Sequence, residues 1–307
     1  MVRSSSRELM MGAGISQRSP RASGWLSLLT AVLLVSGCGT SQSVDSASTA
    51  APVKSLTTIA LATTAGSGES WDLVSIGDSI AAGYGLSPGE VNTPEEAFPG
   101  IYARSLGDEL GIEVELHSYF PSQTTNDIRT VAEWNEVLAA DEALRSDLES
   151  AEVVMVWIGY HNVVPAFLFG SCGYEWSDEL EACFKEATAT MPADFDVLLG
   201  EVEALVAEDT VVMIGNQAVA PMQIERWGSE PFWPEMKAVA FDVWWDGIEA
   251  TAAAHGAIMV DSAAALNGPE GDQIRDPKFV LSDKLHMSAV GQRFLADLFL
   301  VADGLGE

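Results

Sequence analysis

The residues whose types could carry out acyl-transfer chemistry stand at two distant places in the chain. Ser79 follows an apolar run at residues 72–77, within the stretch IGDSIAAGYG. Asp283 and His286 stand three residues apart within SDKLHMSAVGQ, near the end of the chain. A carboxylate can orient an imidazole, and the imidazole can then accept the proton of a serine hydroxyl. The three residues are therefore candidates for a nucleophile, its base and the group that orients the base.

Each of these residues also has a simpler interpretation. Asp78 or Ser79 could cap a following helix, because both residue types are favoured at that position. The amino end of such a helix could also bind a phosphate. The pair Asp283 and His286 could belong to a surface turn or to half of a metal site. Among the other histidines, His117 falls inside a predicted strand and His255 at the end of a predicted helix.

The elements that must position these residues alternate along the folded part of the chain. The pattern predicts strands at 72–77, 112–119, 152–159, 210–216 and 257–261, with helical patterns between them. Nearly continuous apolar runs are typical of parallel strands that are covered on both faces. We therefore expect an α/β fold in one domain over residues 71–307. It would be a three-layer α/β/α sandwich with a central, mostly parallel five-stranded sheet. In such a sheet the functional residues lie in loops at the carboxyl ends of the strands.

The two blocks around Ser79 and His286 resemble the first and last sequence blocks of the GDSL, or SGNH, hydrolase family. The resemblance covers roughly residues 71–303. It implies the SGNH/flavodoxin-like sandwich fold, with Ser79 as nucleophile and Asp283 and His286 completing the triad. It also implies that carboxylic esters are cleaved through an acyl-enzyme, with no cofactor, and we assign no metal ligand. The substrate would be a lipid, a small acyl ester or an acetylated glycan.

The inner blocks, which should supply oxyanion donors, match this family less well. The backbone N–H groups of Ser79 and Ser122 would donate, although Ser122 stands where the family usually has glycine. The third block reads WIGYHN, so an alignment with one extra residue selects Asn162 and a gapless alignment selects His161. The sequence favours Asn162, because an amide donates without depending on protonation. These departures leave two alternatives open, a polysaccharide deacetylase and a catalytically idle binding lipoprotein of the same fold.

The first 38 residues are predicted to be an export signal. Arg18 and Arg21 precede an apolar run at 25–35, which is too short to span a bilayer. The following VSGC resembles a bacterial lipoprotein box, which implies cleavage before Cys38 and lipid attachment to it. Residues 39–70, rich in Ser, Thr and Ala, would form a flexible linker. We expect an exported protein that is lipid-anchored on the outer face of a bacterial membrane, or secreted.

Charge and cysteine content add two further expectations. The formal net charge of −30 argues against a nucleic-acid partner, because such a surface repels phosphate backbones. Cys172 and Cys183, close together in one predicted loop of an exported protein, favour a disulfide over a metal site. We expect a monomer.

Overall fold

The structure is a computed structural model that describes residues 70–87, 92–121, 129–163, 176–273 and 276–305. Three predicted functional residues, Cys38, Ser122 and Cys172, lie outside these ranges, as do the predicted signal and linker. The predictions that concern them are therefore not tested by the fold. Cys183 lies within a helix rather than in the predicted loop.

A five-stranded sheet forms the centre of the fold, and all of its neighbouring strands are parallel. Its strand order is β2-β1-β3-β4-β5. The predicted strands are confirmed, with ends that shift by one or two residues. The strands are β1 (Ser70–Gly77), β2 (Glu113–Tyr119), β3 (Val153–Trp157), β4 (Val211–Asn216) and β5 (Ile258–Asp261).

The third strand ends two residues before its predicted end, at Trp157. Gly159 has a φ of +114°, a conformation that side chains rarely allow. A Cβ on Gly159 would also lie 2.6 Å from Nε1 of Trp244. Glycine therefore lets the chain turn out of the sheet against the buried tryptophan.

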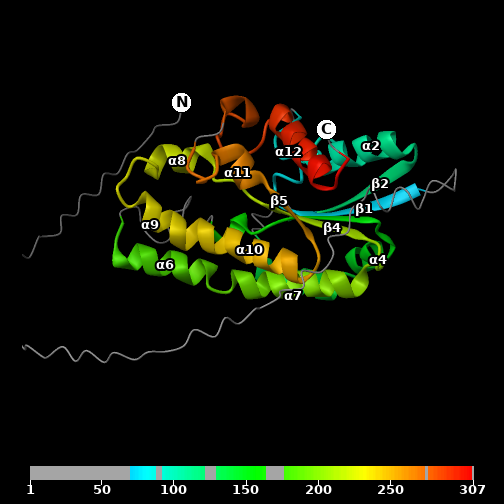
Figure 1. Cartoon of the computed structure of the whole chain (residues 1–307), viewed down its shortest axis with the longest axis horizontal. Coiled ribbons are helices and arrows are strands. Elements are labelled where there is room, and N and C mark those ends of the chain that lie inside the picture. Colours follow the sequence, from blue (N-terminus) through cyan, green and yellow to red (C-terminus); the bar gives the residue numbers. More distant parts are fainter. Residues whose placement is uncertain (1–69, 88–91, 122–128, 164–175, 274–275, 306–307) are drawn as a thin grey trace, which may run out of the picture. The chain divides into compact units, whose positions relative to one another are not determined.

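Helices cover both faces of the sheet, which gives the predicted three-layer sandwich (Figure 1). One layer contains α2, α11 and α12, and the other contains α3, α4, α6, α7, α9 and α10. A π-helical turn at Ala238–Asp242 joins α9 to α10. The helices are α2 (Phe98–Leu110), α3 (Val131–Ala140), α4 (Glu142–Ser150), α6 (Asp178–Thr188), α7 (Met191–Leu205), α8 (Pro221–Trp227), α9 (Trp233–Lys237), α10 (Val243–Ala254), α11 (Ser262–Asn267) and α12 (Ala289–Ala302), with a 3₁₀ turn at Pro277–Phe279.

The core consists of two hydrophobic clusters, one on each face of the sheet. Val74 and Ile76 of β1 point into one cluster, and Leu73 points into the other. On the α2–α12 face, Trp157 packs against Phe98 and Phe299, with ring centroids 5.1 and 6.1 Å away. Burial on both faces explains why the strand sequences are almost continuously apolar.

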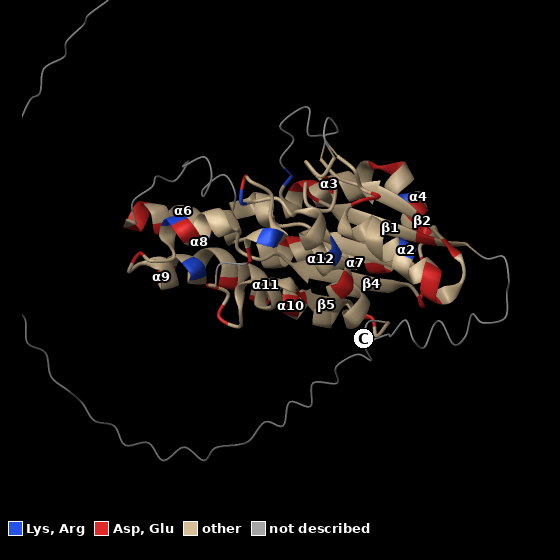
Figure 2. Cartoon of the chain, turned by 90° about the horizontal axis from the view of Figure 1, so that it is seen from above, with Lys and Arg blue, Asp and Glu red and all other residues tan. Residues whose placement is uncertain are grey.

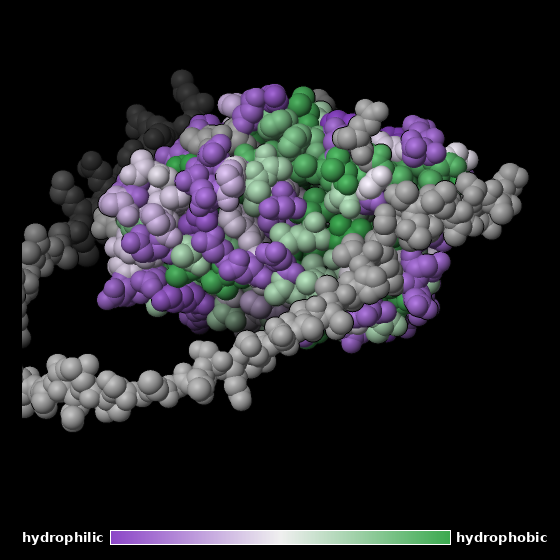
Figure 3. All heavy atoms as spheres, viewed as in Figure 1, coloured by the Kyte–Doolittle hydropathy of each residue, from purple (hydrophilic) through white to green (hydrophobic). Residues whose placement is uncertain are grey.

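Polar residues dominate much of the surface of the described chain. Acidic residues outnumber basic ones across the helices, in keeping with the net charge of −30 (Figure 2). Hydrophilic residues also cover much of the face in Figure 3, with smaller hydrophobic areas among them. None of the described helices combines the length and apolarity needed to cross a membrane.

The contact between α2 and α12 includes a buried carboxyl group that makes stability depend on pH. The hydroxyl of Tyr102 donates to Asp303, and the N–H of Leu305 donates to its other oxygen at 2.9 Å. Burial raises the pKa of Asp303 from 3.8 to about 6, although both hydrogen bonds oppose the shift. Between these two values the folded protein binds a proton that the unfolded chain has lost.

We therefore predict that Asp303 makes the folded protein less stable as the pH rises from about 4 to 6. The Asp303→Asn variant cannot ionise, so its free energy of unfolding should rise relative to wild type over this interval. The pKa difference corresponds to at most about 3 kcal/mol. Urea unfolding of both proteins at pH 4, 5, 6 and 7 measures the difference. A difference that stays constant with pH would contradict the prediction.

Candidate active site

The turn that carries Ser79 follows β1, and the sheet continues in opposite directions from the two edges of this strand. β1 pairs with β2 on one side and with β3 on the other. The N–H of Asp78 donates to the carbonyl of Trp157 at 3.1 Å, which ties the ends of β1 and β3 together. Because crevices form at such a topological switch point, Ser79 lies where a parallel sheet presents its functional edge.

The helix-cap interpretation of Asp78 and Ser79 is wrong. Residues 79–85 form turns, and the next helix, α2, begins only at Phe98. Asp78 accepts from the N–H of Ile80 at 2.8 Å and from Nε2 of Gln217 at 2.6 Å. The carboxylate thus fixes the Ser79 turn and links it to the segment after β4.

Burial dominates the electrostatics of Asp78, whose exposed fraction is 3%. Desolvation raises the pKa of this carboxyl, while the two hydrogen bonds, and the rings of His161 and His286 when they are protonated, lower it in part. Both histidines therefore lie within electrostatic range of the residue that precedes Ser79. Asp78 acts on the site indirectly, by fixing the turn, because its two oxygens already accept hydrogen bonds from Ile80 and Gln217.

Gln292 of α12 holds the Ser79 turn from the opposite side. Its Nε2 donates to the carbonyl of Ile80 at 2.9 Å, and its Oε1 accepts from the N–H of Phe98 at 2.9 Å. The side chain is almost completely buried. One amide therefore joins the turn, the start of α2 and the last helix.

The loop before α12 brings His286 to Ser79. His286 Nε2 lies 3.0 Å from Ser79 Oγ, and His286 Nδ1 lies 2.7 Å from Asp283 Oδ2. The second oxygen of Asp283 accepts from the N–H groups of Leu285 and His286. The structure thus places the three sequence-predicted residues in one hydrogen-bonded line, with hydroxyl, imidazole and carboxylate in that order.

Asp283 is charged in this arrangement at neutral pH. Partial burial alone would raise its pKa, but the hydrogen bonds from His286 and the two backbone N–H groups lower it below the usual value. A charged carboxylate favours the imidazole tautomer with its proton on Nδ1. That tautomer leaves Nε2 free to accept the proton of Ser79.

A ring contact with Tyr84 and the turn at Lys284 restrict the position of His286 further. The ring of Tyr84 packs against the imidazole, with centroids 4.4 Å apart. Lys284 has a φ of +59°, the positive-φ non-glycine residue of the described chain, and its ammonium group lies 2.6 Å from Glu225 of α8. The unusual turn lets Asp283 fold back toward His286.

The third block places His161 and Asn162 in different roles. Asn162 Oδ1 accepts from the N–H of Val131, the first residue of α3, at 3.1 Å. His161 Nδ1 accepts from the N–H of Arg129 at 3.1 Å, so the proton of the neutral ring lies on Nε2. Asn162 therefore holds the amino end of α3 through its carbonyl oxygen and keeps its Nδ2–H groups to donate, and His161 keeps its Nε2–H.

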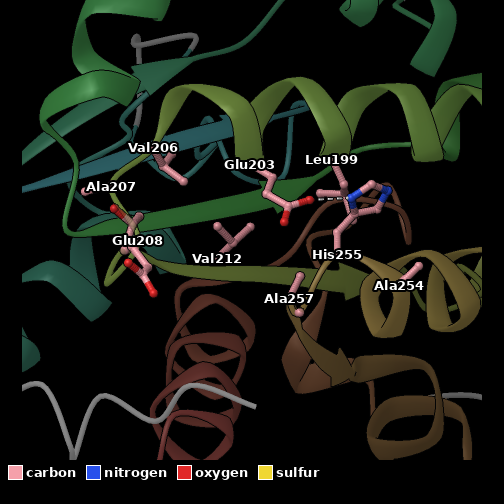
Figure 4. Close-up of a pocket in the computed structure, with 11 residues that line it drawn as sticks. Leu199, Glu203, Val206, Ala207, Glu208, Val212, Ala254, His255 and Ala257 are labelled. Atoms are coloured by element: carbon pink, nitrogen blue, oxygen red, sulfur yellow. Dashed lines mark hydrogen bonds and ion pairs between the residues drawn. The ribbon is translucent and has the colours of Figure 1, made fainter. Parts of the chain in front are cut away.

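In the described part of the chain, cavities lie near the carboxyl ends of the strands and near their amino ends. A very small one beneath the Ser79 turn, of about 10 Å³, contacts Ile80, Tyr160 and Leu285. A larger one of about 440 Å³ is lined by residues at the amino ends of β4 and β5, and His255 contacts Glu203 there (Figure 4). Since Ser79 follows the carboxyl end of β1, the larger cavity does not belong to its site.

Sequence reasoning found the three hydrogen-bonded groups but missed the residues that hold them. Gln217 and Gln292 come from the ends of β4 and α12, and no spacing relates them to Ser79. The one available signal was their residue type, because a glutamine within an apolar pattern must find hydrogen-bond partners when buried. The remaining histidines are elsewhere, with His117 in β2 and His255 at the end of α10, as predicted.

An all-parallel five-stranded sheet between helices, with Ser79, His286 and Asp283 hydrogen-bonded at its carboxyl edge, matches the α/β fold of SGNH hydrolases. The chain belongs to the GDSL-like lipase/acylhydrolase family, whose model matches residues 75–294. This confirms the resemblance seen in the two terminal blocks. It also supports a hydrolase that acts on esters, at the level of the family.

Solved structures confirm the fold. A lipase from a goat rumen metagenome is 17% identical with a TM-score of 0.58, over 77% of this chain and 99% of that chain. An acetylxylan esterase from Geobacillus stearothermophilus is 20% identical with a TM-score of 0.51, over 78% and 95%. An extracellular lipase from Streptomyces rimosus is 17% identical with a TM-score of 0.51, over 76% and 99%. Among curated proteins, no relative matches the sequence.

We predict that Gln292 stabilises the fold and the Ser79 turn together. In Gln292→Met, a side chain of similar volume leaves the buried N–H of Phe98 and carbonyl of Ile80 without this partner. The free energy of unfolding should fall by about 2–4 kcal/mol, since each unpaired buried group costs about 1–3 kcal/mol. Arg293→Met is the matched control on the exposed side of the same helix and should change it by less than about 1 kcal/mol. Equal effects of the two substitutions in urea unfolding would contradict this role.

Proposed function

We propose that the protein is an extracytoplasmic serine esterase that cleaves carboxylic esters through an acyl-enzyme. The observation that carries the proposal is the 3.0 Å separation of Ser79 Oγ and His286 Nε2, with Asp283 on the other imidazole nitrogen. This order of groups is what a serine needs to become a nucleophile at neutral pH. Membership of an acylhydrolase family supports the same chemistry.

In the proposed reaction, Ser79 Oγ attacks the ester carbonyl carbon while its proton passes to His286 Nε2. The tetrahedral intermediate collapses, the carbon–oxygen bond to the alcohol breaks, and the imidazolium gives its proton to the departing alkoxide. Water then attacks the acyl-enzyme with His286 again as base, which releases the carboxylic acid and restores Ser79. Asp283 stays charged throughout and orients the ring.

For the oxyanion donors we propose His161 in place of the sequence-favoured Asn162. Asn162 Nδ2 also carries N–H groups, because only its carbonyl oxygen is engaged with α3. We favour the Nε2–H of His161, because the Arg129 N–H fixes its tautomer and the ring lies within electrostatic range of Asp78, the residue before Ser79. The backbone N–H of Ser79 is the second proposed donor. Ser122, outside the described residues, stays the predicted third.

The substrate class stays broad in this proposal. Lipids and small acyl esters are one group, because two structural neighbours are described as lipases. Acetylated polysaccharides are the alternative, because another neighbour is described as an acetylxylan esterase. A catalytically idle binding protein is the candidate from outside the enzymes.

The location of the protein is also a proposal. The VSGC sequence and the Ser- and Thr-rich linker at 39–70 support lipid attachment at Cys38 and a domain held outside the membrane. A disulfide between Cys172 and Cys183 would suit this exported location.

We predict that Ser79→Ala and His286→Ala each lower kcat/KM for aryl esters by at least about a thousandfold, because triad members act as a unit. Asp283→Asn should also be severe. His255→Ala is the matched control, since this histidine also contacts two carboxylates but lies at the other edge of the sheet, and it should keep near-wild-type activity.

A serine-directed fluorophosphonate separates the esterase from the idle binder. The wild-type protein should be labelled at Ser79, and the His286→Ala variant should react far more slowly. An unlabelled wild-type protein that is correctly folded would exclude the proposed activity. Comparing aryl acetates and palmitates with acetylated xylan would then separate the two substrate groups.

The exchange of Asn for His at the oxyanion position leads to a further prediction. His161→Ala should lower kcat on the order of 10²–10³-fold with little change in KM. His161→Asn should recover part of this loss, because it restores an N–H donor. Asn162→Ala should act mainly on stability, by freeing the amino end of α3. A folded Asn162→Ala variant with the larger loss in kcat would favour the one-residue gap instead.

A further inference from the structure

A second cluster of titratable side chains lies at the opposite end of β1 from Ser79. Asp72 is in the first half of β1, and Glu115 and His117 are on the neighbouring edge strand β2. Seven residues separate Asp72 from Ser79, which corresponds to about 23 Å of strand. The cluster is therefore distinct from the proposed active site.

The strand register is the reason that these three side chains share one place. Asp72 is directly opposite Glu115, and His117 follows two residues later on the same face of β2. One ligand atom from each of the three lies within 4.8 Å of the other two. The side chains of Asp72 and His117 are only 30% and 25% exposed, so the group is partly sheltered.

A third carboxylate, that of Asp147, orients the imidazole. Asp147 of α4 lies 3.1 Å from His117 Nδ1, and it also accepts from the hydroxyl of Tyr119 at 2.5 Å. A histidine that donates its Nδ1–H to a carboxylate presents an unprotonated Nε2 on its other side. This is the arrangement in which proteins prepare histidine as a metal ligand.

The unprotonated Nε2 of His117 faces the carboxylates of Asp72 and Glu115, which are acceptors, rather than a donor. It lies 3.3 Å from Asp72 Oδ1, longer than the 2.7–2.9 Å that is usual for a charge-assisted hydrogen bond. Tetrahedral zinc bonds of about 2.0–2.1 Å place neighbouring ligand atoms about 3.3 Å apart. Across the described ranges, no Lys or Arg forms an ion pair with Asp72, Glu115 or Asp147.

We propose that Asp72, Glu115 and His117 bind a divalent transition-metal ion of the Zn²⁺ type, with Asp147 as the carboxylate that orients His117. One nitrogen and two carboxylate oxygens suit zinc, and water would complete its coordination. The ion offsets the mutual repulsion of the carboxylates and joins β1 to the edge strand β2. Its role is structural, because the cluster is remote from Ser79.

Titration of the full-length protein, stripped of metal with a chelator, with ZnCl₂ alone tests the proposal. Calorimetry should show a site of micromolar or tighter Kd, and the melting temperature should rise with zinc. Asp72→Asn and Glu115→Gln should each weaken binding at least tenfold, and His117→Gln should abolish it. Asp147→Asn should weaken it about 10–100-fold, as expected for an orienting carboxylate.

Two controls separate this site from other histidines. His255→Gln removes an imidazole that also lies between two carboxylates, and it should leave the affinity unchanged. His286→Ala removes any zinc bound at the proposed active site and should likewise keep the structural site. X-ray absorption of the His286→Ala protein should show one imidazole in an otherwise oxygen-coordinated shell.

Glu115→Gln is the decisive variant, because Glu115 is exposed and its substitution leaves the core untouched. Unchanged zinc affinity in a folded Glu115→Gln protein would overturn the proposal. So would a wild-type protein that binds no zinc at submillimolar concentration. In that case His117 would be an imidazolium held between Asp72 and Asp147.

Discussion

The burial of β1 from Leu73 to Gly77, in the middle of a parallel sheet, is the constraint on which the rest of the structure depends. Leu73, Val74 and Ile76 have no exposed surface, and β2 and β3 pair with both edges of the strand. A strand enclosed in this way can present a side chain to solvent only where it ends. Ser79 lies at that end, and the segments that follow β3, β4 and β5 converge there because parallel strands all end at the same edge.

The carboxylates of the protein show how burial separates residues of one type into different roles. Asp78, beside Ser79, is buried and has both oxygens occupied, so it fixes the turn. Asp283 is partly exposed, keeps its charge through three hydrogen bonds and orients His286. Asp147 shares its charge between His117 and Tyr119. Position in the fold, rather than residue type, decides what each carboxylate does.

Both ends of β1 thus bring imidazole and carboxylate together, but with different third partners. At the carboxyl end the free imidazole nitrogen meets a hydroxyl, which can lose a proton and attack. At the amino end it meets carboxylates, which can only accept. A hydroxyl makes the first arrangement suited to catalysis, and a surplus of acceptors makes the second suited to a cation.

The sequence by itself determined the five strands, the parallel character of their sheet and the candidate residues Ser79, Asp283 and His286. The apolar pattern of each strand can be read from its own sequence, and the two terminal blocks carry Ser79, Asp283 and His286 as short local patterns. Only the tertiary structure decided which side chains support them. Gln217, Gln292 and Tyr84 reach the site through strand order and helix packing, which leave no mark in local spacing. The contact of the Val131 N–H with the Asn162 carbonyl, and that of the Arg129 N–H with the His161 ring, likewise depend on where the segment around the amino end of α3 lies.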